Sequence, residues 1–253
     1  MNKLIDMVTY FNSVTSELEI KQSISDNENY DYVITNINEY PHAIIFMAVI
    51  DQNSIDGLPE SLPYKYLSAN KDFSFFQLSK LSHNEFRKNM MLADYNVGDV
   101  EIDLLYSAIE TIKKNFHANA ANIWNDSPSS HILKQRLMMF DGMNVEKANI
   151  LLIILVQKFN IKLADTKDIN ISYDKRILVA MTKIGLISDE YVSYEEVKRV
   201  TREIYPSYPG IFDGFFFMIG SYIIAGRDNN AIINRSKETI IYECIEAVNS
   251  LKK

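Results

Sequence analysis

Two short segments of this chain combine residue types that could do chemistry on a nucleotide. The first is Phe140–Asn149, in which Gly142 and Asn144 stand where a tight turn would reverse the chain between two helices. Glycine and asparagine are the residues that most readily accept a positive φ. The second segment is Tyr173–Arg176, which places the carboxylate of Asp174 at the mouth of a new helix. A turn that can hold a phosphate, with a carboxylate nearby, supplies the parts for such chemistry.

The carboxylate of Asp174 is the main catalytic candidate. Hydrolysis of an N-glycosidic bond passes through an oxocarbenium-like state, and a nearby carboxylate can stabilise that charge or deprotonate the attacking water. The simpler interpretation is that Asp174 caps the helix expected at 175–184, and the two roles are compatible. Lys175 and Arg176 add local positive charge that suits a phosphate, unless they only form a solvated helix face.

The turn at 141–148 is the candidate phosphate site. It would donate backbone N–H groups at the start of the helix that opens at Val145. The alternative is an ordinary αα-hairpin that packs into the core, and Asp141 makes the local field less favourable to DNA. The DNA contacts expected in this segment are Gly142, Met143, Asn144, Val145 and Lys147.

Glu146 has two interpretations. If it points into the site, a second carboxylate near Asp174 would raise the pKa of one of the pair and supply a general acid. If it points to solvent, it has no part in the chemistry and stands in a protein that no longer cleaves.

Helices must position these residues, because the apolar side chains recur mostly at the helical period of about 3.6 residues. Pro41 suits the first turn of a helix, and Asp99 suits the N-cap of another. Ser82–Glu85 and Ser193–Glu196 are capping boxes, and a last helix is expected from Ser236.

Composition narrows the function classes. The chain has 253 residues, of which 47% are hydrophobic and 23% charged, and its net charge is −7. The acidic balance is the main compositional argument against nucleic-acid binding, so a basic footprint must be local. The single cysteine, Cys244, rules out a disulfide framework, and the four histidines lack metal-ligand spacing. We therefore expect an intracellular, cytoplasmic protein with no membrane span and no metal site.

Taken in order, several segments resemble the helix-hairpin-helix DNA glycosylase superfamily, which has the endonuclease III-like fold. Ala43–Gln52 is similar to the early helix that ends in a glutamine near the lesion. Phe140–Asn149 is similar to the hairpin, and Tyr173–Leu186 to the segment that carries the catalytic aspartate. Pro63–Tyr64 and Ile123–Trp124 bring the similarity closest to the branch called "iron-sulfur cluster loop" or endonuclease III-related.

The departures from that pattern alter the expected chemistry. Glu146 stands where bifunctional members carry a lysine nucleophile, so lyase activity at abasic sites is not expected. The neighbouring Lys147 is a poor substitute, because one residue turns a helical side chain by about 100°. The cluster cysteines that follow the segment equivalent to Gly220–Tyr222 are absent, so we predict no iron–sulfur cluster.

The resemblance implies an all-α fold of two lobes around a cleft, with a helical lobe at about 40–140 and a hairpin and aspartate lobe at about 141–225. Residues 1–39 and 226–253 would add flanking helices. It implies a monomeric, monofunctional glycosylase that flips a damaged or modified base out of double-stranded DNA. No organic cofactor is implied, although a monovalent cation on the hairpin carbonyls would be in keeping with it.

Further site residues follow from the same comparison. Gln52 could fill the gap left by the flipped nucleotide, or simply end a helix. Tyr173, Trp124 and Tyr64 could line the base pocket, or lie in the core as aromatic residues at helix ends commonly do. The other functions considered are a catalytically inactive DNA-binding or interaction module derived from this fold, and a helical protein with no nucleic-acid role.

Overall fold

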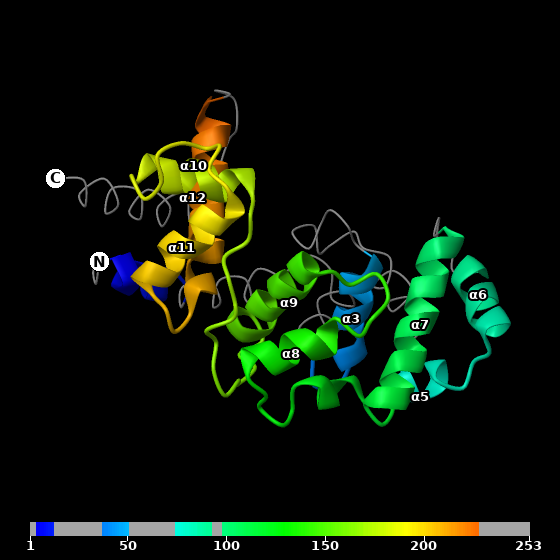
Figure 1. Ribbon diagram of the computed structural model, residues 1–253. Helices are drawn as coiled ribbons and strands as arrows, with labels where there is room; N and C mark the ends of the chain where they lie inside the picture. Colours follow the sequence, from blue (N-terminus) through cyan, green and yellow to red (C-terminus); the bar gives the residue numbers. More distant parts are fainter. Residues whose placement is uncertain (1–3, 13–36, 51–73, 93–97, 228–253) are drawn as a thin grey trace. The chain divides into compact units, whose positions relative to one another are not determined.

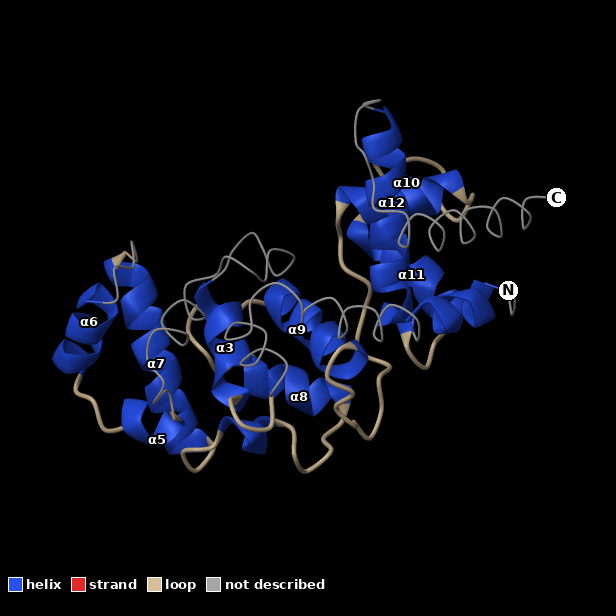
Figure 2. Ribbon diagram, turned by 180° about the vertical axis from the view of Figure 1, so that it is seen from behind, coloured by secondary structure: helices blue, strands red, loops and turns tan. Residues whose placement is uncertain are grey.

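The computed structural model describes residues 4–12, 37–50, 74–92 and 98–227. The described part is built from helices and loops and contains no strand, which confirms the all-α prediction at this level (Figure 2). None of the helices in these ranges is long and apolar enough to cross a membrane. Gln52, Tyr64, Ser236 and Cys244 lie outside the described residues.

The chain divides into two compact units, and each is described by itself. Unit 1 comprises Met1–Leu18 and Asp165–Lys253, and unit 2 comprises Glu19–Ala164. The boundary therefore lies after the predicted hairpin rather than before it, so the hairpin falls in unit 2 and Asp174 in unit 1. The physical reason is packing, since the helix that follows the turn packs against helices of unit 2.

Unit 2 is organised around the helix α3 (Pro41–Ile50), which is apolar except for His42 and in which Pro41 to Val49 are all buried. The long helix α7 (Asp99–Asn115) turns Ile102, Leu105 and Ile109 inward and packs against α3. The other described helices of this unit are α5 (Phe75–Leu78), α6 (His83–Leu92), η2 (Ala120–Ile123), α8 (Ser130–Leu137) and α9 (Val145–Gln157) (Figure 1).

The helix starts in unit 2 agree only partly with the capping predictions. Ser82 and Glu85 form the predicted capping box at α6, because the Glu85 carboxylate accepts from the Ser82 amide at 2.8 Å while the Ser82 hydroxyl accepts from the Glu85 amide at 3.4 Å. At α7 the prediction is wrong by one residue, since Gly98 is the N-cap and Asp99 is the first helical residue. The Asp99 carboxylate instead accepts from the Arg87 guanidinium at 2.5 Å.

Unit 1 joins the beginning of the chain to its later part. Helical residues 4–12 pack with α10 (Lys175–Lys183), α11 (Tyr194–Ile204), η3 (Pro209–Phe212) and α12 (Asp213–Arg227) around one core. Its largest fully buried side chains include Phe11, Phe212, Phe215 and Phe216. The Phe11 and Phe215 rings meet edge to face with their centroids 5.2 Å apart, so the two sequence segments share a single core.

Helices α10 and α12 approach each other very closely at Gly220. A Cβ atom at this position would lie 1.8 Å from the carbonyl oxygen of Arg176, so no other residue fits without moving the backbone. This contact fixes the first turn of α10, where Asp174 and Arg176 lie.

Candidate functional site

The α8–α9 hairpin forms as predicted, but its two turn residues differ in conformation. Gly142 has a φ of +80°, as expected. Asn144 has a φ of −123°, so it does not adopt the positive φ that its residue type readily accepts. Asn144 is the N-cap of α9, and its side-chain oxygen accepts a hydrogen bond from the Lys147 amide at 2.8 Å. That cap requires extended backbone, which explains the difference.

Gly142 is required by space as well as by conformation. A Cβ atom on it would lie 2.7 Å from the Val49 carbonyl oxygen and 3.1 Å from a methyl carbon of Leu104. The turn therefore sits directly against the C-terminal end of α3.

Lys147 is the residue whose placement differs most from the sequence interpretation. Its side chain is buried, with 8% of the residue exposed, instead of lying at a DNA-binding surface. The ammonium nitrogen Nζ donates to the Gly142 carbonyl at 2.9 Å and to the Val49 carbonyl at 3.3 Å. The positive charge thus satisfies backbone oxygens inside unit 2.

The outer side of the hairpin presents the start of α9. Asn144, Val145 and Glu146 are exposed, whereas Met143 is buried. Glu146 lies in the first turn of α9, where a carboxylate is favoured by the helix dipole. Asp141 accepts a hydrogen bond from the Ser107 hydroxyl at 2.5 Å, which ties the turn to α7.

Trp124 lies in the core of unit 2, with 3% of the residue exposed, and directly follows η2. It is placed as the packing interpretation expected, and it presents no face for a base.

Asp174 is the N-cap of α10, as the simpler interpretation predicted. One carboxylate oxygen, Oδ1, accepts from the Arg176 amide at 2.7 Å and from Arg176 Nε at 2.8 Å, and Oδ2 accepts from Arg176 Nη2 at 2.9 Å. The guanidinium therefore clasps the carboxylate from within the first turn of the same helix. These bonds to Arg176 hold the pKa of Asp174 below its ordinary value, against the opposing effect of burial.

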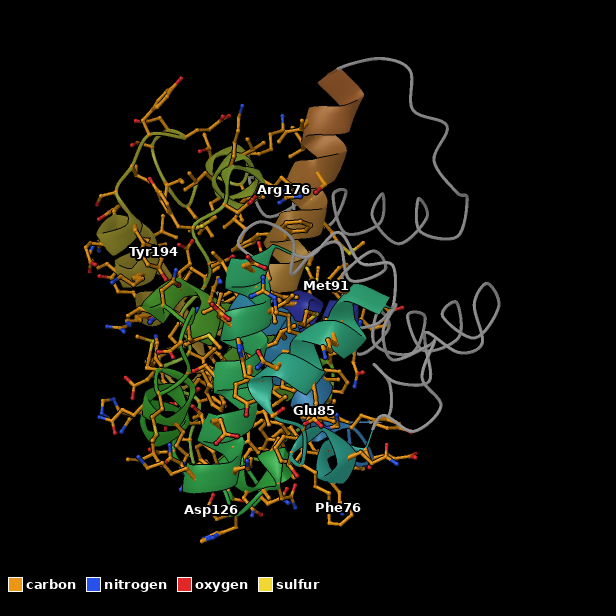
Figure 3. The ribbon with its side chains drawn as sticks, turned by 90° about the vertical axis from the view of Figure 1, so that its right-hand side faces the viewer. Phe76, Glu85, Met91, Asp126, Arg176 and Tyr194 are labelled. Atoms are coloured by element: carbon orange, nitrogen blue, oxygen red, sulfur yellow. The ribbon has the colours of Figure 1, made fainter. Side chains whose placement is uncertain are left out.

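The Arg176 side chain is itself held in place from a second side. Its guanidinium carbon lies 3.7 Å from the centroid of the Phe217 ring on α12, and Figure 3 shows it beside that helix. Arg176 thus points at Asp174 and Phe217, whereas the expected DNA contact Lys175 is exposed.

Tyr173 is partly exposed and packs against Tyr194, with ring centroids 5.4 Å apart. Its hydroxyl donates to the Val192 carbonyl at 2.7 Å, and that of Tyr194 donates to the Ile171 carbonyl at 3.0 Å. The two rings brace the segment before α10 against the start of α11. Tyr173 is thus the one predicted pocket aromatic in the described part of the chain that reaches the surface.

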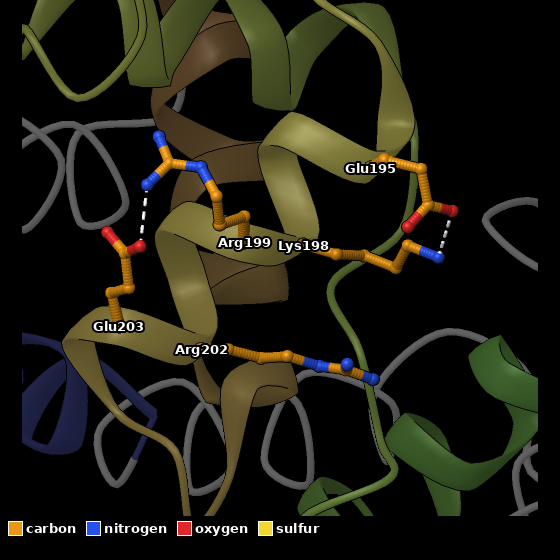
Figure 4. Close-up of a pocket in the computed structure, with 5 residues that line it drawn as sticks. All are labelled: Glu195, Lys198, Arg199, Arg202 and Glu203. Atoms are coloured by element: carbon orange, nitrogen blue, oxygen red, sulfur yellow. Dashed lines mark hydrogen bonds and ion pairs between the residues drawn. The ribbon is translucent and has the colours of Figure 1, made fainter.

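A shallow hollow on α11 was not singled out from the sequence. It has a volume of about 320 Å³ and is lined by Glu195, Lys198, Arg199, Arg202 and Glu203 (Figure 4). The alternation of acidic and basic residues in 194–204 is the signal that could have indicated it.

The cations of this hollow are matched by acceptors. Arg199 donates to Glu196 at 2.7 Å and to Glu203 at 2.6 Å, which raises its pKa. Lys198 pairs with Glu195, and Arg202 Nε donates to the Asn170 side chain at 3.0 Å. Lys198 and Arg199 are therefore paired with carboxylates, whereas Arg202 is bonded to a neutral amide oxygen.

Among the described residues, no cluster of three or more histidine, cysteine or acidic side chains is arranged to hold a metal ion. Comparison with protein-family models, with curated proteins and with solved structures finds no match for this chain.

Proposed function

We propose that this protein binds double-stranded DNA through the α8–α9 hairpin and acts as a monofunctional DNA glycosylase, with Asp174 promoting hydrolysis of the N-glycosidic bond. The observation that carries the proposal is the hairpin itself. Gly142 at φ +80° and the Asn144 cap present an exposed helix start, a form of backbone that suits a phosphate.

The state of Asp174 supports a particular role in that reaction. A carboxylate whose pKa is held low by Arg176 is ionised at neutral pH and is a weak base. Such a group is better suited to stabilising a developing oxocarbenium charge than to removing a proton from water.

Glu146 has a subordinate place in the proposal. Its exposed position at the first turn of α9 favours the interpretation that it points to solvent. We therefore propose no general-acid step through Glu146, and no Schiff-base chemistry in its place.

The Asp174–Arg176 ion pair also favours a second candidate, the catalytically inactive DNA-binding module. A carboxylate clasped through both oxygens is neutralised by its partner, which weakens its action on a substrate. In that case the hairpin would still bind DNA, and no base would be released.

The deciding experiment uses duplexes that hold a panel of damaged and modified bases. The purified protein is incubated with each duplex, and strands are analysed before and after alkali, which cuts wherever a base has been lost. We expect cleavage that requires alkali and that falls by at least about a thousandfold in Asp174→Asn.

Asp189→Asn is the matched control. Asp189 Oδ1 accepts from the amide two residues on, Tyr191, at 2.8 Å, as Asp174 does from Arg176, but the residue is exposed and lies outside the proposed site. This variant should keep full activity. DNA binding without base loss would favour the inactive module, and a protein that neither binds nor cleaves DNA would fit a helical protein with no nucleic-acid role.

A further inference from the structure

The buried ammonium of Lys147 lies where two chain segments meet that are far apart in sequence. It donates to the Val49 carbonyl, in the last turn of α3, and to the Gly142 carbonyl, in the hairpin turn. The last carbonyls of a helix lack partners within it and carry partial negative charge. A cation is the group that suits this position best.

Three carbonyls of the turn accept hydrogen bonds. The Phe140 carbonyl accepts from the Met143 amide at 3.1 Å, and the Asn144 carbonyl accepts from the Ala148 amide at 2.9 Å. The Gly142 carbonyl accepts from the Lys147 ammonium at 2.9 Å. A dissolved cation bound by these three oxygens would lie a few ångströms from the ammonium, and like charges at that separation in a partly buried site repel each other. The residues present therefore do not fit the monovalent cation that the family resemblance implies.

We propose that Lys147 is a positioning residue, whose ammonium serves as a built-in cation and ties the hairpin turn to the end of α3. In this way it holds the first turn of α9 in a fixed place without a dissolved cation. Asn144 assists, because its side chain caps the Lys147 amide at 2.8 Å, so the backbone and the ammonium of one residue are both anchored to the turn. The role of Lys147 in preparing the hairpin for a phosphate rests on the proposed function. Its role in holding the hairpin turn against α3 does not.

The first test needs neither DNA nor a variant. Hydrogen exchange of the amides at 140–148 is measured in the full chain at constant ionic strength in potassium, sodium or choline chloride. We expect the same protection in all three salts, because the cation is covalently attached. Protection that increases specifically with potassium or sodium would overturn the proposal, since it would place a dissolved cation at the turn.

The second test is Lys147→Met, which keeps most of the length of the side chain and removes its charge. Loss of two charge-assisted hydrogen bonds should speed exchange of the hairpin amides by about tenfold or more. Lys114→Met is the matched control, because Lys114 is exposed in the last turn of α7 within the same unit. Equal exchange in the two variants and the wild type would contradict the proposal.

The third test is rescue, a result that a merely space-filling side chain would not give. Lys147→Ala leaves room beside the two carbonyls, and we expect added methylammonium to restore much of the hairpin protection to this variant and none to Lys147→Met. The affinity for a short duplex should fall by about tenfold in Lys147→Ala and recover in parallel. Absence of rescue would overturn the proposal. Duplex binding that is missing in the wild type would refute the proposed function alone, because the exchange measurements would still decide the role of Lys147.

Discussion

The carboxylate of Asp174 stands out in the sequence, but in the structure both of its oxygens accept hydrogen bonds from the side chain of Arg176, two residues away. The cap role and the catalytic role make opposite demands on the charge of Asp174, since a cap needs a stable anion and a base needs an available one. Arg176 favours the ionised, stable form of Asp174, because its guanidinium donates to both carboxylate oxygens. The Phe217 ring packs against the guanidinium and holds it in place.

Replacing Arg176 tests this account. Arg176→Gln removes the positive charge, so the pKa of Asp174 should rise towards its ordinary value of 3.8. The measurement is a titration of the Asp174 carboxyl carbon by NMR, with Lys175→Gln, at an exposed neighbour in the same turn, as the control. An unchanged midpoint in Arg176→Gln would mean that Arg176 is not what lowers the pKa.

The same pair predicts how stability depends on pH. A carboxyl group with a lowered pKa in the folded state contributes stability above its unfolded value, and this contribution disappears as the pH falls through the lowered pKa. The wild type should therefore be more stable than Arg176→Gln at neutral pH, and the two melting temperatures should converge as the pH falls below 3.8. Melting curves from neutral to strongly acidic pH give this comparison directly, and a constant difference would contradict it.

At the scale of elements, the hairpin is fixed by contacts from outside itself. Its turn is held by the end of α3 through Lys147, and by Ser107 of α7 through Asp141. The sequence predicts a turn at this place, but only the packing of α3 and α7 gives the turn a unique position. Substitutions in α3 or α7 should therefore change the position of the hairpin turn, even when the residues of the turn itself are kept.

Two glycines with nearly the same φ allow the cost of the backbone conformation to be separated from the cost of the contact with α3. Gly142 and Gly185 have φ values of +80° and +78°, but only Gly142 is crowded, whereas a Cβ on Gly185 would meet nothing within 4 Å. Gly185→Ala should lower the free energy of unfolding by about 1 kcal/mol, the cost of the backbone conformation alone. Gly142→Ala should lower it by about 3 kcal/mol, because the backbone must also move away from the Val49 carbonyl. Urea denaturation followed by circular dichroism measures both, and equal losses would show that the α3 contact yields easily.

At the scale of the whole molecule, unit 1 is built from two segments that are far apart in the sequence. Helical residues 4–12 belong to unit 1 with residues beyond 164, because Leu4, Val8 and Phe11 lie in the same core as α10, α11 and α12. An amphipathic N-terminal segment has no partner until this core is assembled, so it carries no local indication of which unit it joins.

Phe11→Ala tests this assignment. Removing a fully buried ring that packs on Phe215 should destabilise unit 1 by about 4 kcal/mol. Trp124 is the only tryptophan in the sequence and is buried in unit 2, so its fluorescence follows that unit alone. We expect the variant to lose helical circular dichroism at lower temperature, while the Trp124 transition keeps its midpoint. A joint shift of both signals would show that the two units unfold as one.

The sequence by itself determined the helical class, the hairpin between α8 and α9, and the capping of α10 by Asp174. These features depend on local chemistry: periodicity, a glycine in the turn, and a short acidic side chain before a helix. At Asn144 the residue type indicates the turn, but it does not decide between a positive φ and an N-cap, because asparagine is common in both.

Only the tertiary structure decided the surroundings of several large side chains. Lys147 is turned inward by the Val49 carbonyl of α3 and the Gly142 carbonyl of the turn. Trp124 is enclosed in unit 2, and Arg176 is held between Asp174 and Phe217. One of the two carbonyls bonded to Lys147 lies 98 residues away, and the ring that contacts Arg176 lies on another helix. Local sequence carries no record of such neighbours, because a long flexible side chain takes its direction from the surfaces that fold around it.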